Sequence, residues 1–267
     1  MKVLVVSKDG RVGKSAIARE VFYANMKNNP LYVEIESLNE STSDYSSITN
    51  LVRFETLNSE NIKDFFVTVA DHKGDVVADG GASEIHAIQS LLKDQGFLVS
   101  TFFDLIVIPL TLGSREVRSF IDISTTLIES GMKPDSILPI VNFYDRSSKL
   151  EEKLFSPVKK FGLPFIEDDF LFLPRMDGIE NLSSSKLSSL DFSEKAELEA
   201  RKAISENKGE KNTSVLVEIY MNSSSVSKVK EVTPELFSRI EYKVSSLGGS
   251  EGALRPKSSK RNESQEG

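Results

Sequence analysis

The sequence predicts an α/β fold in which a doubly wound, mostly parallel sheet carries helices on both faces. Apolar runs rich in β-branched residues alternate with stretches of helical spacing, which is the pattern of parallel strands joined by crossover helices. The chain has 267 residues, of which 39% are hydrophobic, and this is enough to bury one large core. Ligands of such sheets bind beyond the carboxyl ends of the strands.

The first six apolar runs and the stretches between them give the expected elements. Pro30 ends the first helix, and Gly96 and Gly131 are placed as C-terminal stops for two later helices. The polar stretch 36–49 is expected to be a loop or a mobile segment. The expected strands are 2–6, 31–35, 75–79, 104–110, 136–143 and 170–173, and the expected helices are 13–28, 59–70, 84–95, 114–130 and 147–161.

The composition shifts toward Ser, Lys and Glu after residue 180. We therefore expect a core at 1–180, a mostly helical extension packing on it at 181–245, and a disordered tail at 246–267. A helix is expected at 191–205, and 215–221 fits either a strand or a buried helix. Thr233 and Pro234 together predict the start of a last helix, since Thr is a good N-cap and Pro is tolerated in the first turn.

Composition excludes several classes of function. The chain has no cysteine and two histidines, so it has no disulfide framework and little capacity for a histidine-ligated metal. No apolar run approaches the roughly 20 residues of a transmembrane helix, so no membrane-spanning segment and a cytoplasmic location are expected. The net charge of -7 argues against a surface covered in positive charge for nucleic acid. Basic residues of the tail leave weak, salt-sensitive direct DNA contact as an alternative.

The stretch SKDGRVGKSAIARE follows the first strand and opens the first helix. A phosphate-binding loop needs that position, because backbone N–H groups and the helix N-terminus together attract phosphate. Lys14 is expected to meet the β and γ phosphates, and Ser15 to ligate Mg²⁺. The full pattern has a glycine six places before the lysine, where this chain has Lys8. The expected cofactor-binding residues of the loop are Lys8, Gly10, Arg11, Val12, Gly13, Lys14, Ser15 and Ala16.

The run VGKSAIA at 12–18 resembles the deviant Walker A motif of the ParA/MinD ATPases, and is most similar to the plasmid-encoded branch with StbB and the conjugal-transfer TraL proteins. In that motif a signature lysine reaches the partner's phosphates across a nucleotide-sandwich dimer. This chain has Asp9 there, Lys8 at the first glycine and Arg11 at the second of two adjacent glycines. Either Lys8 or Arg11 supplies the missing charge, or the site binds nucleotide and hydrolyses it very slowly.

Acidic residues follow two further strands. In VEIE the resemblance aligns Glu34 and Glu36 with acidic switch residues near magnesium and the attacking water. We expect Glu36 to orient water, whereas Glu34 is either functional or a solvated strand-end residue. Asp79, in DVVADGGAS, resembles a Walker B aspartate that serves Mg²⁺. Asn142 ends a strand and either reads the nucleotide base or forms a turn. The expected catalytic residues are Lys14, Glu36, Asp79 and Arg11, and the expected metal ligands are Ser15 and Asp79.

The resemblance implies a switch enzyme that binds and hydrolyses ATP with Mg²⁺ and forms an ATP-dependent homodimer. It also implies a role in plasmid stability, partition or conjugative transfer, alongside a plasmid DNA-binding adaptor protein. The alternative is a nucleotide-binding assembly module with little or no hydrolysis, which the departures at Lys8, Asp9 and Arg11 favour. A small-molecule kinase is a weaker alternative, because no arginine-rich lid is evident. The role of 181–267 is not assigned by any motif.

Overall fold

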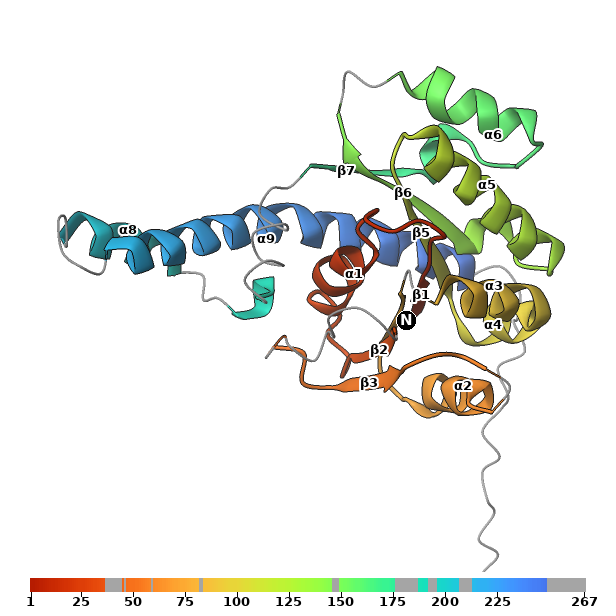
Figure 1. Ribbon diagram of the computed structural model, residues 1–267, viewed down its shortest axis with the longest axis horizontal. Helices are drawn as coiled ribbons and strands as arrows, with labels where there is room; N and C mark the ends of the chain where they lie inside the picture. Colours follow the sequence, from red (N-terminus) through yellow and green to blue (C-terminus); the bar gives the residue numbers. More distant parts are fainter. Residues whose placement is uncertain are drawn as a thin grey trace, which may run out of the picture.

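The computed structural model contains a seven-stranded sheet in the order β3-β2-β4-β1-β5-β6-β7, in which every neighbouring pair is parallel (Figure 1). The structure describes residues 1–36, 45, 47–58, 60–81, 84–145, 149–175, 187–191, 196–206 and 213–248. The strands are β1 (Lys2–Val5), β2 (Leu31–Ile35), β3 (Leu51–Phe54), β4 (Val76–Gly80), β5 (Leu105–Leu110), β6 (Ile137–Tyr144) and β7 (Leu171–Pro174).

Helices cover both faces of the sheet, so the expected doubly wound fold is confirmed. Successive strand residues point to opposite faces, and each face has its own apolar core. In β1, Leu4 belongs to one core cluster, whereas Val3 and Val5 belong to the other. Chain order reverses at β1, where β4 lies on one side and β5 on the other. That is where such folds place their ligands.

One face of the sheet is covered by α2 (Ile62–Asp71), α3 (Ile85–Asp94), α4 (Gly96–Phe102), α5 (Ser114–Glu129) and the η4–α6 helix (Glu151–Phe155 and Ser156–Lys160). The other face carries the first helix, α1 (Lys14–Ala16) continuing as the π-helix η1 (Ile17–Tyr23), and α9 (Thr213–Gly248). Shorter helical turns are η3 (Pro134–Ser136), η5 (Glu167–Asp169) and η6 (Ser189–Asp191). Phe22 of η1 meets Phe237 of α9 edge to face, with ring centroids 6.2 Å apart.

The sequence reasoning counted six strands and missed β3. This strand has four residues, is only partly buried, and lies at the sheet edge beside β2. Its register pairs Arg53 with Glu34, and the two side chains form an ion pair at 3.5 Å. The strand is the short run LVRF at the sheet edge, and the sequence reasoning assigned this stretch to no element.

The expected start of the last helix at Thr233 and Pro234 is wrong, because both residues lie inside the 36-residue helix α9. The Thr233 hydroxyl donates to the Val229 carbonyl one turn earlier, which is helix-interior geometry and not a cap. Buried Val229 and Ile240 lie on either side of the proline along the helix. Packing of this helix on both sides therefore outweighs the one backbone hydrogen bond that proline removes. Residues 215–221, for which strand and helix were both expected alternatives, are part of the same helix.

The helix expected at 84–95 ends where Gly96 was expected to stop it, since α3 ends at Asp94 with Gln95 as its C-cap, but α4 begins at Gly96 itself. A side chain at Gly96 would collide with Ser130, so close packing against the end of α5 explains the glycine.

Of the expected tail, 246–248 is the end of α9 and the rest lies outside the described residues, as does most of 36–49. Among the described helices, even α9 lacks the apolar stretch needed to cross a bilayer.

The extension after the core consists of α8 (Ala196–Glu206) and the long helix α9 in the described part of the chain. The later half of α9 packs on the sheet through Leu236, Phe237 and Ile240. Its first half runs beside α8 and projects away from the core (Figure 1). The domain boundaries at 180 and 245 stay a prediction.

Candidate functional site

The strand ends bring the predicted site residues to one edge of the sheet. Register pairs Asp79 of β4 with Val5 of β1 on one side and with Glu34 of β2 on the other. The loop 8–13 leaves the end of β1 at this edge and leads into α1. Parallel strands end at the same edge, so Asp79, Glu36 and the loop lie together for a topological reason.

The loop has two residues in the left-handed backbone region. Gly13 has φ 88° and immediately precedes α1, and a side chain there would collide with the amide of Asn142. Glycine is therefore required at this position for both conformation and space. Arg11 has φ 61°, an uncommon value for a residue with a side chain, and it occupies a place where the resembling motif has glycine. Arg11 thus has a backbone conformation that glycine adopts at lower cost.

Asn142 supports the loop from β6. Its side-chain amide donates to the Val12 carbonyl at 3.0 Å, and its Oδ1 accepts from the Phe143 N–H at 2.9 Å. Phe143 itself has φ 55° and is 38% exposed. The described geometry therefore gives Asn142 a role in holding the loop. Its reading of a nucleotide base stays a prediction.

Lys14 lies buried beneath the loop among acidic side chains. Its ammonium group donates to the Asp9 carbonyl at 2.8 Å. Burial lowers the pKa of Lys14, and the negative charges of Asp79, Asp9 and Glu36 oppose that effect. The predicted catalytic lysine and the two predicted acidic residues are thus close enough to interact electrostatically.

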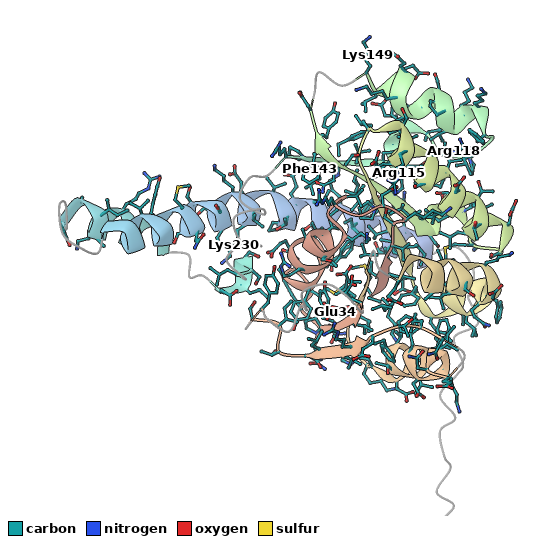
Figure 2. All side chains as sticks on the ribbon, viewed as in Figure 1. Glu34, Arg115, Arg118, Phe143, Lys149 and Lys230 are labelled. Atoms are coloured by element: carbon teal, nitrogen blue, oxygen red, sulfur yellow. The ribbon has the colours of Figure 1, made fainter. Side chains whose placement is uncertain are left out.

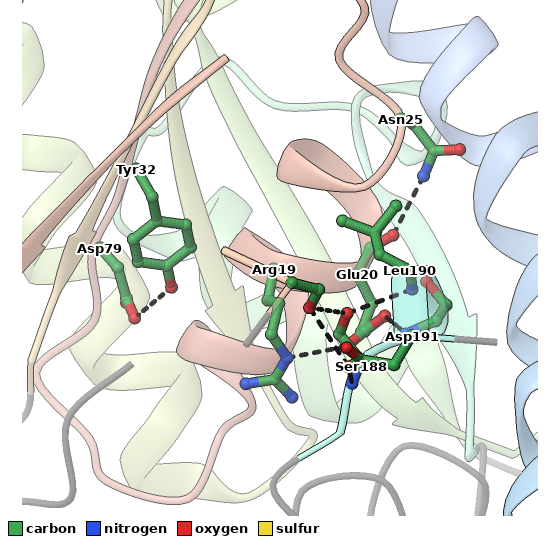
Figure 3. Close-up of polar contacts among 10 residues, drawn as sticks. Arg19, Glu20, Asn25, Tyr32, Asp79, Ser188, Leu190 and Asp191 are labelled. Atoms are coloured by element: carbon green, nitrogen blue, oxygen red, sulfur yellow. Dashed lines mark hydrogen bonds and ion pairs between the residues drawn. The ribbon is translucent and has the colours of Figure 1, made fainter. Parts of the chain in front are cut away.

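Asp79 is buried, and its two carboxylate oxygens have different surroundings. Oδ2 accepts a hydrogen bond from the Tyr32 hydroxyl at 2.9 Å (Figure 3). Oδ1 is buried without a hydrogen-bond partner. Burial raises the pKa of Asp79, opposed by the hydroxyls of Ser15 and Tyr32 and by the charge of Lys14. A buried carboxylate oxygen without a partner is costly, which is typical of a group that serves a ligand.

Glu36 and Glu34 differ in their surroundings. Glu36 is buried just beyond β2, and a side chain at Gly81 would collide with its carboxylate. The glycine after β4 therefore leaves room for Glu36 at the edge of the site. Glu34 is buried and pairs with Arg53 on β3, so it has a structural partner that the sequence reasoning did not include.

The departures from the phosphate-loop pattern contact α5. Lys8 forms an ion pair with Asp122 at 3.2 Å, and Asp9 forms one with Arg115 at 2.8 Å. Asp9 is buried, and its Oδ2 has no hydrogen-bond partner. The sequence reasoning missed Arg115 and Asp122, which no motif marks. The only available signal was that two charged residues replaced glycine and lysine and therefore needed new partners.

Gly10 and Arg11 are exposed on the loop, and Ser15 is exposed in the first turn of α1. The residues present fit a magnesium nucleotide, because an accessible loop at a helix N-terminus lies over a buried lysine and a carboxylate oxygen without a partner. No cluster of three or more carboxylate, histidine or cysteine side chains suited to a metal occurs in the described segments. Ser15 and Asp79 would therefore supply only part of a magnesium shell, as is usual where phosphates and water supply the rest.

No protein-family model matches the sequence, and no curated protein matches it either. Similar folds occur among solved structures. A putative plasmid partition protein from Borrelia burgdorferi B31, bound to AMPPNP, has 14% identity and a TM-score of 0.48, with 82% of this chain and 96% of that chain covered.

MinD from Pyrococcus horikoshii, complexed with Mg-ADP, has 13% identity and a TM-score of 0.45, covering 87% of this chain and 98% of its own. The pNOB8 ParA bound to nonspecific DNA has 11% identity and a TM-score of 0.47, covering 92% of this chain and 98% of its own. At such low identities the likeness concerns the fold alone.

Proposed function

We propose that this chain is an ATP-binding and ATP-hydrolysing switch protein of the ParA/MinD type. The observation that carries the proposal is the buried group of Lys14 and Asp79 under an accessible loop, with one oxygen of Asp79 lacking a partner. Burial lowers the pKa of Lys14, and the negative charges of Asp79, Asp9 and Glu36 oppose that shift. A buried cation near a carboxylate oxygen without a hydrogen-bond partner suits the phosphates and magnesium of a nucleotide.

Each residue then has a separate task in the proposed site. The backbone from Gly10 to Ala16 would cradle phosphate oxygens, and Lys14 would exchange the Asp9 carbonyl for the β and γ phosphates. Ser15 and Asp79 would hold magnesium, which when bound neutralises phosphate charge. Glu36, at the edge beside Gly81, would orient the attacking water.

The cellular role is proposed from the resemblance of 12–18 to the motif of plasmid-encoded ParA/MinD proteins, including the StbB and TraL branch. On this proposal the chain forms an ATP-dependent homodimer and acts in the cytoplasm with a plasmid DNA-binding adaptor protein. The process would be plasmid stability, partition or conjugative transfer. Direct contact with DNA would be weak and sensitive to salt.

The second candidate is a nucleotide-binding assembly module with little or no hydrolysis. Asp9 favours it, because a buried aspartate paired with α5 cannot reach across a dimer to a partner's phosphates as the signature lysine does. The two candidates share the binding site and differ only in turnover.

The test is magnesium-dependent ATP hydrolysis by the purified chain as a function of protein concentration, together with binding of a fluorescent ATP analogue. Lys14→Ala is expected to abolish turnover and to weaken binding about 100-fold or more, since it removes charge-assisted contacts to two phosphates. Lys73→Ala is the matched control, because Lys73 is exposed and precedes β4 at the opposite edge of the sheet.

Turnover per molecule that rises with protein concentration, and that falls to background in Lys14→Ala alone, would support a dimeric ATPase. Binding without turnover in the unmodified chain would support the assembly module. If the unmodified chain does not bind the ATP analogue, or Lys14→Ala binds it equally well, both candidates are rejected.

A further inference from the structure

The position of Arg115 suggests a further role at the same site, and this inference rests on the proposed function. It is the second residue of α5, and no sequence motif marks it. Its Nε atom lies 2.8 Å from Asp9 Oδ1. Figure 2 shows Arg115 at the end of the sheet that carries the phosphate loop. We propose that Arg115 binds the terminal phosphates of the nucleotide in its own chain and supplies the positive charge that Asp9 lacks.

The exposure of the two partners supports a role beyond packing. The Arg115 side chain is 81% exposed, whereas that of Asp9 is 4% exposed. An ion pair with one so exposed partner contributes little to stability, so stability alone does not explain why a carboxylate is buried there. The second oxygen of Asp9 also lacks a hydrogen-bond partner.

The donors of the guanidinium group are only partly used. The contact with Asp9 uses Nε, and within the described segments no hydrogen bond engages the two terminal amino groups. A guanidinium held at one edge keeps its other donors in a fixed fork, which matches the geometry of a phosphate. Asp9 therefore acts as a positioning residue that directs an exposed cation.

The backbone of Asp9 places this cation near Lys14. The Asp9 carbonyl accepts from the Lys14 ammonium at 2.8 Å, while the side chain of the same residue contacts Arg115. One loop residue thus contacts both cations. A second ion pair, Lys8 with Asp122, ties the loop to α5 two turns further on. Both pairs join α5 to the loop of the same chain, so the charge of Arg115 lies beside the loop of its own chain.

The experiment compares Arg115→Ala and Arg115→Lys with the control Arg118→Ala. Arg118 is also exposed on α5, and Arg118→Ala removes the same charge, but Arg118 forms no ion pair or hydrogen bond with the loop in the described part of the chain. The readouts are the affinities for fluorescent analogues of ATP and AMP, measured at low and moderate salt, and the thermal unfolding midpoint without nucleotide.

We expect Arg115→Ala to weaken ATP binding about 10- to 100-fold, the range of one or two lost charge-assisted hydrogen bonds. AMP binding should stay within about twofold, because AMP lacks the phosphates in question, and the unfolding midpoint should move no more than in Arg118→Ala. Arg115→Lys should recover part of the ATP affinity, since it keeps the charge but not the fork.

The proposal is overturned if Arg115→Ala weakens ATP binding no more than Arg118→Ala does, or weakens ATP and AMP equally. Mixing Arg115→Ala with Lys14→Ala tests the placement within one chain: recovered turnover in the mixture would mean that Arg115 acts across a dimer and would reject it. Failure of the proposed function looks different, because then the unmodified chain and Lys14→Ala bind ATP equally poorly.

Discussion

Two groups of buried charges lie along the first helix, and they differ in how completely they are satisfied. Arg19 and Glu20 on η1 form an ion pair at 2.7 Å (Figure 3), and Glu20 Oε2 also accepts the Ser189 N–H at 3.0 Å. The Arg19 guanidinium lies over the Tyr45 ring, 4.0 Å from its centroid. At the other end of the helix, Lys14 is near carboxylates of which two oxygens lack partners.

This difference in hydrogen bonding distinguishes a structural group of buried charges from a candidate ligand site. The charges of Arg19 and Glu20 are paired with each other, and they connect the first helix to Tyr45 and Ser189, which are distant in sequence. The Lys14 group leaves polar atoms unsatisfied at an accessible loop, as ligand sites do. Buried charge alone therefore does not mark a site, and the unsatisfied oxygen is the better sign.

The largest effect should come from breaking the satisfied group. Arg19→Met leaves Glu20 buried without its cation, and we expect a loss of about 3–5 kcal/mol in the free energy of unfolding. Replacing both partners, as in Arg19→Met with Glu20→Met, should cost clearly less than the single change. Urea unfolding measures both, and a single-variant loss below about 1 kcal/mol would contradict the structural role.

Asp79→Asn should have the opposite sign. It removes a buried negative charge that has one oxygen without a partner, so the nucleotide-free protein should gain about 1 kcal/mol. The same variant should lose magnesium-dependent ATP binding. Urea unfolding paired with a nucleotide titration tests this, and a loss of stability in Asp79→Asn would mean that the carboxylate is structural.

The pH dependence of Asp79 follows from its raised pKa. Between the ordinary carboxyl pKa of the unfolded chain and the raised pKa of the folded chain, the folded state holds more protons. Asp79 therefore makes the nucleotide-free protein more stable as the pH falls through that window, and Asp79→Asn lacks this contribution. The difference in unfolding free energy between the two proteins, measured from neutral to acidic pH, should shrink as the pH falls. A constant difference would contradict a raised pKa.

The smallest effect concerns the strained loop residue. A left-handed conformation costs a residue with a side chain about 1–2 kcal/mol, whereas glycine loses about 0.5–1 kcal/mol more backbone entropy on folding. Arg11→Gly should therefore stabilise the protein by about 0.5 kcal/mol, given the φ of 61° at Arg11. Arg118→Gly, inside helix α5, should lose about 1 kcal/mol and serves as the control. A loss in Arg11→Gly would show that its side chain has contacts that outweigh the strain.

The sequence was sufficient where a local pattern determines the geometry. Alternating strands and helices predicted the parallel sheet, and the carboxyl-edge rule predicted that Lys14, Ser15 and Asp79 would share one place. It was insufficient where partners come from distant segments: Arg115 with Asp9, and Tyr32 with Asp79, are pairings across 106 and 47 positions of the chain. Edge strand β3 and the helix interior at Thr233 were missed because tertiary packing determines both.

The continuous helix α9 has a mechanical consequence. From Phe237, which touches the first helix, to Thr213 at its far end, α9 is about 36 Å long at 1.5 Å per residue. A rotation of about 10° at that contact would move the far end by about 6 Å. Because the first helix begins at the loop 8–13, a small tilt of that helix would be magnified at the projecting end of α9 beside α8.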